Sequence, residues 1–365
     1  MKKLLLILLL APMLHGAAFA EGLAERGSAE WGTAGVRDAL PEELQEIGGE
    51  LSFSGDYDGA GALERLWTSF LNRVGGNLRN EARGAISLLA VCLLCAVSVT
   101  LCTGQKQGDY IQYAGCAAAA LLLTGDMNSL VAEAFSTLKQ MSDYAKAALP
   151  AIFTTAAAGG AIASASARYA ACCLGLDLML VAAEKLICPL VGAALAMAVC
   201  GSIWDNPMLR SGLKLSKRLA GLLMSAMTAG FTALISLTGL VSGSADAAAV
   251  KATKSLLSAA LPVVGKIMAD AASAVVSAAA VVRNTAGAFG IVGVCALCLA
   301  PFARLLVKRW LLILISAAAE MTACDRLARL LGEMSSLMGI LLGLVGSYGM
   351  ILFFSIVSAL RTVTG

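Results

Sequence analysis

The chain has 365 residues, of which 59% are hydrophobic and only 14% are charged, and its formal net charge is +3. Soluble proteins average about 25% charged residues, because a surface in water needs them. The composition therefore excludes a soluble globular domain. Between residues 85 and 361, long apolar runs are interrupted only by isolated charges and short basic clusters. We predict an all-α fold, a polytopic transmembrane helical bundle.

The first 20 residues have the pattern of a cleavable secretory signal. Lys2 and Lys3 precede an apolar run over residues 4–14, and Ala18-Phe19-Ala20 follows as a small-x-small site. The run is shorter than the ~20 residues that a membrane-spanning helix requires. An uncleaved anchor is the alternative reading. Either reading places the next segment outside the cytoplasm, with the mature chain starting near Glu21 in the first case.

Charge divides the remaining chain into an acidic segment and a basic membrane domain. Residues 21–83 hold 12 acidic side chains against 6 arginines, whereas residues 84–365 hold 19 basic side chains against 12 acidic ones. We therefore predict a short acidic extracytoplasmic segment over 21–83 and a multispanning domain over 84–365. Leu63, Leu66 and Trp67 recur at helical spacing and predict an amphipathic helix that runs towards the membrane. The cations lie scattered between apolar helices, which does not fit nucleic-acid binding.

Ten apolar segments are candidate membrane spans, and several are shorter than a perpendicular crossing requires. We expect six to nine of them to cross the bilayer. The segments are 84–102, 110–125, 150–167, 169–183, 186–203, 219–241, 256–282, 285–301, 307–319 and 334–360.

The segment 204–218 is among the most basic in the chain. Asp205-Asn206-Pro207 has the pattern of a helix cap followed by proline in the first turn. The helical repeat places Arg210, Lys214, Lys217 and Arg218 on one face of the helix that follows. If each of the first five candidate spans crosses the membrane, this face lies in the cytoplasm, as the positive-inside rule favours. It is predicted to contact anionic lipid headgroups, and an ordinary solvated helix face is the alternative.

Between the second and third candidate spans, Asn128 and Ser129 offer capping side chains to a helix over residues 130–149. Its apolar residues lie on one face. We predict an external interfacial or partner-binding helix, with a surface helix packed on its own bundle as the alternative.

The residues that most enzymes require are missing. The one histidine, His15, lies in the predicted signal, which excludes histidine-dependent triads and HExxH zinc sites from the mature chain. The sequence contains no P-loop. Cys92-x-x-Cys95 and Cys295-x-x-Cys298 have metal-site spacing, but they lie in apolar spans, where thiols behave as small hydrophobic groups. We predict no catalytic, cofactor or metal site.

Charged residues inside or beside the spans are the sharper candidates, because an isolated charge in hydrocarbon is costly and needs a partner or a wet cavity. Lys266 and Asp270 are spaced to pair along one helix, and Asp325, Arg329 and Glu333 form a second such ladder. Gly339-x-x-x-Gly343 is typical of close helix packing in lipid and also allows a homo-oligomer.

The C-terminal two-thirds of the chain resembles the stage III sporulation protein AE family. The resemblance rests on glycine and proline landmarks with nearby charges: Leu261-Pro262-Val263-Val264-Gly265, Asp270, Arg283-Asn284-Thr285-Ala286-Gly287, Gly290 and Pro301. It implies that these glycines and prolines pack helices. Asp270, Arg283 and Asn284 belong to the landmarks, and together with Lys266, Asp325 and Arg329 they are our candidate structural or pathway residues.

The resemblance also implies a role in endospore formation. Members of the family belong to a secretion-like channel that joins the mother cell to the forespore. The expected partners are other membrane subunits of that channel, a separate cytoplasmic ATPase and a forespore-side protein. The expected location is the mother-cell membrane around the forespore. A free-standing secondary transporter and a membrane scaffold without its own conduit are the alternatives.

Overall fold

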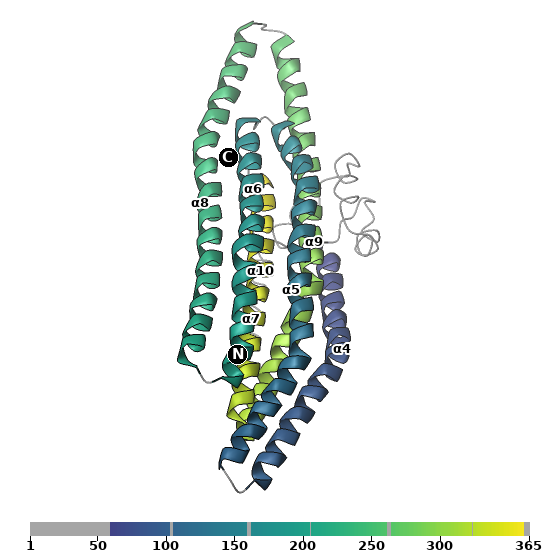
Figure 1. Ribbon diagram of the computed structural model, residues 1–365. Coiled ribbons are helices and arrows are strands. Elements are labelled where there is room, and N and C mark those ends of the chain that lie inside the picture. Colours follow the sequence, from purple (N-terminus) through teal and green to yellow (C-terminus); the bar gives the residue numbers. More distant parts are fainter. Residues whose placement is uncertain are drawn as a thin grey trace.

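The computed structural model describes residues 59–102, 105–158, 162–204, 206–260, 264–322 and 324–360, and every secondary-structure element in these ranges is helical (Figure 1). The predicted signal peptide and most of the acidic segment lie outside the described residues. The elements are α4 (Gly59–Leu101), α5 (Gln105–Ala158), α6 (Ile162–Ala182), the π-helix η1 (Ala183–Ile187), α7 (Cys188–Ile203), α8 (Pro207–Ala260), α9 (Val264–Met321) and α10 (Asp325–Leu360).

The helices are much longer than the predicted segments, because neighbouring segments merge. The helix predicted around Trp67 is confirmed, and it continues as α4 through residue 84 without a break. The segments 169–183 and 186–203 join through η1. In the described residues, five helices are long and apolar enough to cross a membrane, namely Glu81–Leu101, Lys106–Pro150, Ala165–Ile203, Pro207–Thr238 and Asp325–Ala359.

The separate external helix predicted over residues 130–149 is wrong. α5 runs unbroken from Gln105 to Ala158, so Asn128 and Ser129 lie inside a helix and cap nothing. Ser129 instead donates a hydrogen bond to the carbonyl of Asp126 in the preceding turn. The apolar face of this segment packs in the core of the bundle, which is why it is apolar.

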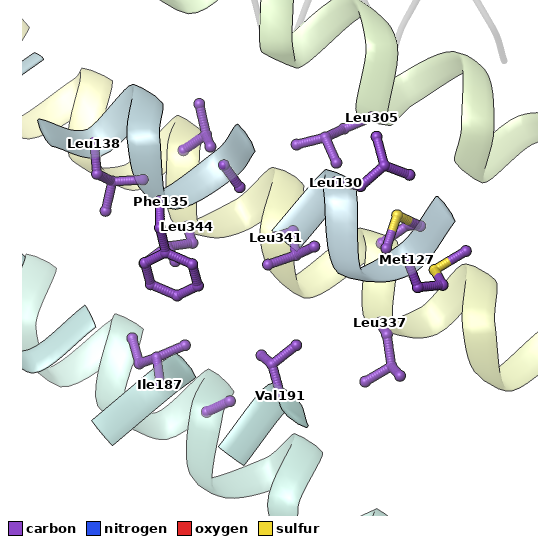
Figure 2. Close-up of a cluster of buried hydrophobic side chains, with 14 of the residues drawn as sticks. Met127, Leu130, Phe135, Leu138, Ile187, Val191, Leu305, Leu337, Leu341 and Leu344 are labelled. Carbon is purple, nitrogen blue, oxygen red and sulfur yellow. The ribbon is translucent and has the colours of Figure 1, made fainter. Parts of the chain in front are cut away.

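Figure 2 shows that core, in which side chains from α5, η1, α7, α9 and α10 converge. Leu130 and Leu138 of α5 are 1% and 0% exposed, and Leu341 of α10 is fully buried between them and α7. The core is continuous along the bundle, because the long helices present apolar residues at every turn.

Two local features shape the chain between α5 and α8. In η1 the amide of Cys188 donates to the carbonyl of Ala183, five residues back. Pro189 follows at once, and because proline has no N–H and its ring crowds the carbonyl four residues back, the wider turn accommodates it. The predicted cap of α8 is confirmed: the side-chain oxygen of Asn206 accepts a hydrogen bond of 2.9 Å from the amide of Met208, with Pro207 in the first turn.

Consecutive long helices alternate in direction (Figure 1). Three helical rods, α4, α5 and α6 with η1 and α7, precede residue 204, in place of the five predicted segments. Both numbers are odd, so the chain reaches residue 204 running in the same direction as α4. Three further helices return the end of α10 to the starting side. The C-terminal end of α8 and the N-terminal end of α9 project beyond the other helices as a hairpin (Figure 1).

α6 and α8 are in close contact where Gly175 meets Phe231. A Cβ atom built on Gly175 would lie 2.5 Å from Cε2 of the Phe231 ring, which is only 5% exposed. We expect Gly175→Ala to lower the free energy of unfolding by about 1–3 kcal/mol, because the buried ring has no free space. Thermal unfolding in detergent, followed by tryptophan fluorescence, measures this loss.

The matched control is Gly192→Ala in α7, where nothing lies within 4 Å of an added Cβ. There the better helix propensity of alanine should stabilise the protein by up to about 1 kcal/mol. Equal effects at the two positions would contradict the close packing of α6 on α8.

Candidate functional site: a charged layer across the bundle

Lys308 of α9 is the most deeply buried charged residue in the described part of the chain, with 2% of its surface exposed. Its ammonium Nζ lies 2.8 Å from Oε2 of Glu81 on α4 and 2.8 Å from Oδ2 of Asp126 on α5. One cation thus connects three helices. A buried cation is stable only with close partners of opposite charge, and Lys308 has two.

Arg304, one helical turn before Lys308, extends the network. Its Nε lies 3.4 Å from Oε1 of Glu81, and its terminal nitrogen forms an ion pair with Glu133 on α5. Three carboxylates therefore surround two cations, so this cluster carries one excess negative charge when all five groups are ionised. Glu81 is the central carboxylate, because it contacts both cations and its side chain is only 12% exposed.

A second ion pair lies at the same level on the other side of the bundle. Lys217 of α8 pairs with Glu333 of α10 and lies 3.3 Å from the hydroxyl of Ser336. Two residues after Glu333, the Ser335 hydroxyl donates to the carbonyl of Arg309, the neighbour of Lys308. We call these residues together the charged layer: Glu81, Asp126, Glu133, Lys217, Arg304, Lys308 and Glu333.

Long uncharged stretches leave this layer in opposite directions. On α4, residues 84–101 follow Glu81 and contain no charge, and on α8 residues 219–238 follow Arg218 and contain none. At 1.5 Å per residue they measure about 27 Å and about 30 Å. α4 and α8 run in opposite directions on opposite sides of the bundle, so the two stretches extend from the charged layer towards opposite ends of the molecule (Figure 1). Each is about as long as a hydrocarbon core of about 30 Å is thick, so a bilayer that covers either stretch has the charged layer at its edge.

Further ion pairs lie on the outer face where α5 meets α6 and η1. Lys139 is 3.1 Å from Glu184 in η1, and Lys146 is 3.2 Å from Asp177 of α6. The side chains of the second pair are 57% and 55% exposed, so water screens it and we expect each such pair to contribute less than about 1 kcal/mol. Asp177, which lies inside the apolar segment 169–183, is therefore accounted for by a surface pair.

Most of the charged residues predicted from the sequence do not belong to the charged layer. Lys266, Asp270, Arg283 and Asn284 belong to the N-terminal half of α9, away from the charged layer along the helix, and their side chains lie outside the described part of the structure. Asp325 and Arg329 lie in the first turns of α10 and are exposed. Glu333, predicted to pair along its own helix, pairs with Lys217 across the bundle.

The predicted packing residues contact neighbouring helices where the structure describes them. A Cβ on Gly339 would lie 2.9 Å from Cζ of Arg309, and one on Gly343 would lie 2.9 Å from the Met224 methyl group. Gly290 faces Ile152 and Ile356. Pro301 is buried within α9, Gly265 and Gly287 belong to the same helix, and Pro262 lies outside the described residues.

One residue of the predicted lipid-facing group is placed wrongly by the sequence pattern. Lys217 points into the bundle and is held by Glu333, whereas Lys214 and Arg218 are exposed and Arg210 is partly buried. The four cations do share one half of the helix, but α10 covers one edge of that half. The periodicity of a helix shows which residues share a face, not which neighbour covers it.

The sequence analysis missed the centre of the site. Arg304 and Lys308 have the same four-residue spacing as Lys266 and Asp270, but the segments 285–301 and 307–319 left Arg304 in a presumed loop and placed Lys308 at the start of the next candidate span. Pro301 suggested that break, although α9 continues through it. The sequence did contain a signal for this site. Two cations four residues apart lie in an apolar run with no acidic residue nearby in sequence, and such a pair requires carboxylates from other helices.

The cysteines form no ligand set in the described residues. Cys92 and Cys95 are 3% and 4% exposed in the core, and no group of three or more cysteine, histidine or acidic side chains there is arranged to hold a metal ion.

Long apolar helices, a continuous buried core and charges paired across helices define an all-helical, multi-pass membrane protein. The sequence profile of the stage III sporulation protein AE family matches residues 53–362, and the chain belongs to this family. It is 22% identical over 318 residues to stage III sporulation protein AE of Bacillus subtilis (strain 168), covering 83% of this chain and 78% of the relative. No solved structure matches. The chain is thus a sporulation membrane protein, as the resemblance implied.

Proposed function

We propose that the protein is a non-enzymatic subunit of the membrane platform of a secretion-like channel between mother cell and forespore. The observation that carries the proposal is the family match over residues 53–362, which includes all the long helices. The charged layer supports it, because ion pairs between α4, α5, α8, α9 and α10 would hold a rigid platform together. Energy would come from a separate cytoplasmic ATPase, and the platform would lie in the mother-cell membrane.

The proposed orientation places the start of α4 outside the cytoplasm and the basic segment 204–218 inside. The excess of cations in this segment supports that assignment through the positive-inside rule. The acidic segment would then contact partners between the two membranes, including a forespore-side protein. The basic segment would contact cytoplasmic partners.

The test is a detergent pull-down of the tagged full chain from sporulating and from vegetative cells of the host. We expect a cytoplasmic ATPase and several small membrane proteins to be recovered during sporulation only. A homo-oligomer without these partners, present in growing cells, would contradict the proposal and favour a secondary transporter.

Substitutions of Lys266, Asp270 and Arg283 by uncharged residues distinguish a subunit that forms a conduit from one that serves as a scaffold. Counts of heat-resistant spores report function, and the pull-down reports assembly. Loss of spores with normal assembly favours a conduit through this subunit. Loss of assembly favours a scaffold.

A further inference from the structure

The outer face of the first turns of α8 combines exposed cations with exposed apolar side chains. Going round the helix, the buried residues Leu213, Ser216 and Ala220 face the bundle. Lys214 and Arg218 come next and are exposed. Beyond them lies an exposed apolar strip, in which Met208, Leu215, Leu219 and Leu222 are 81%, 57%, 40% and 64% exposed.

Charge on this face is one-sided. The sequence contains no acidic residue from 206 to 245, so α8 supplies no carboxylate of its own there. Glu333, the carboxylate that contacts this part of α8 from α10, is already held by Lys217. Lys214 and Arg218 therefore present positive charge outwards and suit an anionic group.

The position along the helix identifies the kind of anion. Both cations directly precede the uncharged stretch 219–238, which is about 30 Å long and matches a hydrocarbon core. They also lie beside the charged layer, from which this stretch extends. Long basic side chains at the border of a hydrocarbon core extend their charged ends to the headgroups while their stems cover apolar surface.

We propose that Lys214 and Arg218 bind the phosphate-bearing headgroup of an anionic phospholipid, whose acyl chains lie along Leu215, Leu219 and Leu222. Lys217 takes no part, because it is consumed by its ion pair with Glu333. The inference rests on the geometry of α8 and is independent of the channel proposal.

The test is native mass spectrometry of the full chain in mild detergent, titrated with phosphatidylglycerol or phosphatidylcholine. We expect phosphatidylglycerol to bind more tightly. Lys214→Gln and Arg218→Gln should each weaken its first binding step about fivefold, the equivalent of about 1 kcal/mol per cation. Phosphatidylcholine binding should change less than twofold.

A matched variant makes the result specific. Lys139→Gln removes an exposed cation from α5 and should retain phosphatidylglycerol affinity within twofold. The proposal is overturned if Lys214→Gln and Arg218→Gln bind like the unchanged protein, or if Lys139→Gln loses as much affinity. It is also overturned if inorganic phosphate competes as well as the lipid, since the site would then bind a soluble anion.

Discussion

Replacing Lys308 by methionine is expected to lower the free energy of unfolding by about 3 kcal/mol, the lower end of the range for breaking a buried ion pair. Methionine fills a similar volume, so the loss of stability comes from the missing charge and not from altered packing. Glu81 would keep only the longer contact to Arg304 while its side chain remains 12% exposed. Asp126 is 50% exposed and would be resolvated at little cost. Thermal unfolding in detergent measures the change.

The control is Lys146→Met, which breaks the exposed pair with Asp177 and should cost less than about 1 kcal/mol. The double variant Glu81→Leu/Lys308→Met should be more stable than the sum of the single variants predicts, because it leaves no buried carboxylate without its lysine. Equal, small losses for Lys308→Met and Lys146→Met would show that the charged layer does not hold α4, α5 and α9 together.

Gly293→Ala is expected to have the second large effect, a loss of about 1–3 kcal/mol. Tyr144 of α5 is 1% exposed and packs directly on Gly293 of α9, so that an added Cβ would lie 2.6 Å from Cζ of the ring. The tyrosine hydroxyl donates a 3.3 Å hydrogen bond to the carbonyl of Gly290, which fixes the ring in this place. The ring cannot move away without losing this bond and opening the α5–α9 contact.

Two glycines provide the comparison. At Gly290 an added Cβ meets only the ends of two isoleucine side chains, at 3.1 and 3.2 Å, and these can shift by a few tenths of an ångström. At Gly125 nothing lies within 4 Å, so alanine should stabilise the helix by up to about 1 kcal/mol. We expect Gly125→Ala to be the most stable of the three variants, Gly290→Ala to be intermediate and Gly293→Ala to be the least stable. A Gly293→Ala protein as stable as the Gly290→Ala protein would contradict the ring-on-backbone contact.

The glycines show how far sequence reasoning extends. Gly290, Gly339 and Gly343 could be proposed as packing positions, because small residues are the usual means of bringing helices together in lipid. Gly175 and Gly293, which face buried aromatic rings, look no different from them in the sequence. The difference lies in Phe231 and Tyr144, which are 56 and 149 residues away in the chain.

Local properties of the sequence determined the membrane class, the helical fold, the cap of α8 and the family resemblance, because hydropathy, capping and glycine–proline spacing are read over a few neighbouring residues. Tertiary structure decided which helices are continuous, since packing on both sides carries α5 past Asn128 and α9 past Pro301. It also decided which charges meet. Lys308 pairs with carboxylates 227 and 182 residues away, because the energy of an ion pair depends on distance in space and on burial, and the order of residues along the chain specifies neither.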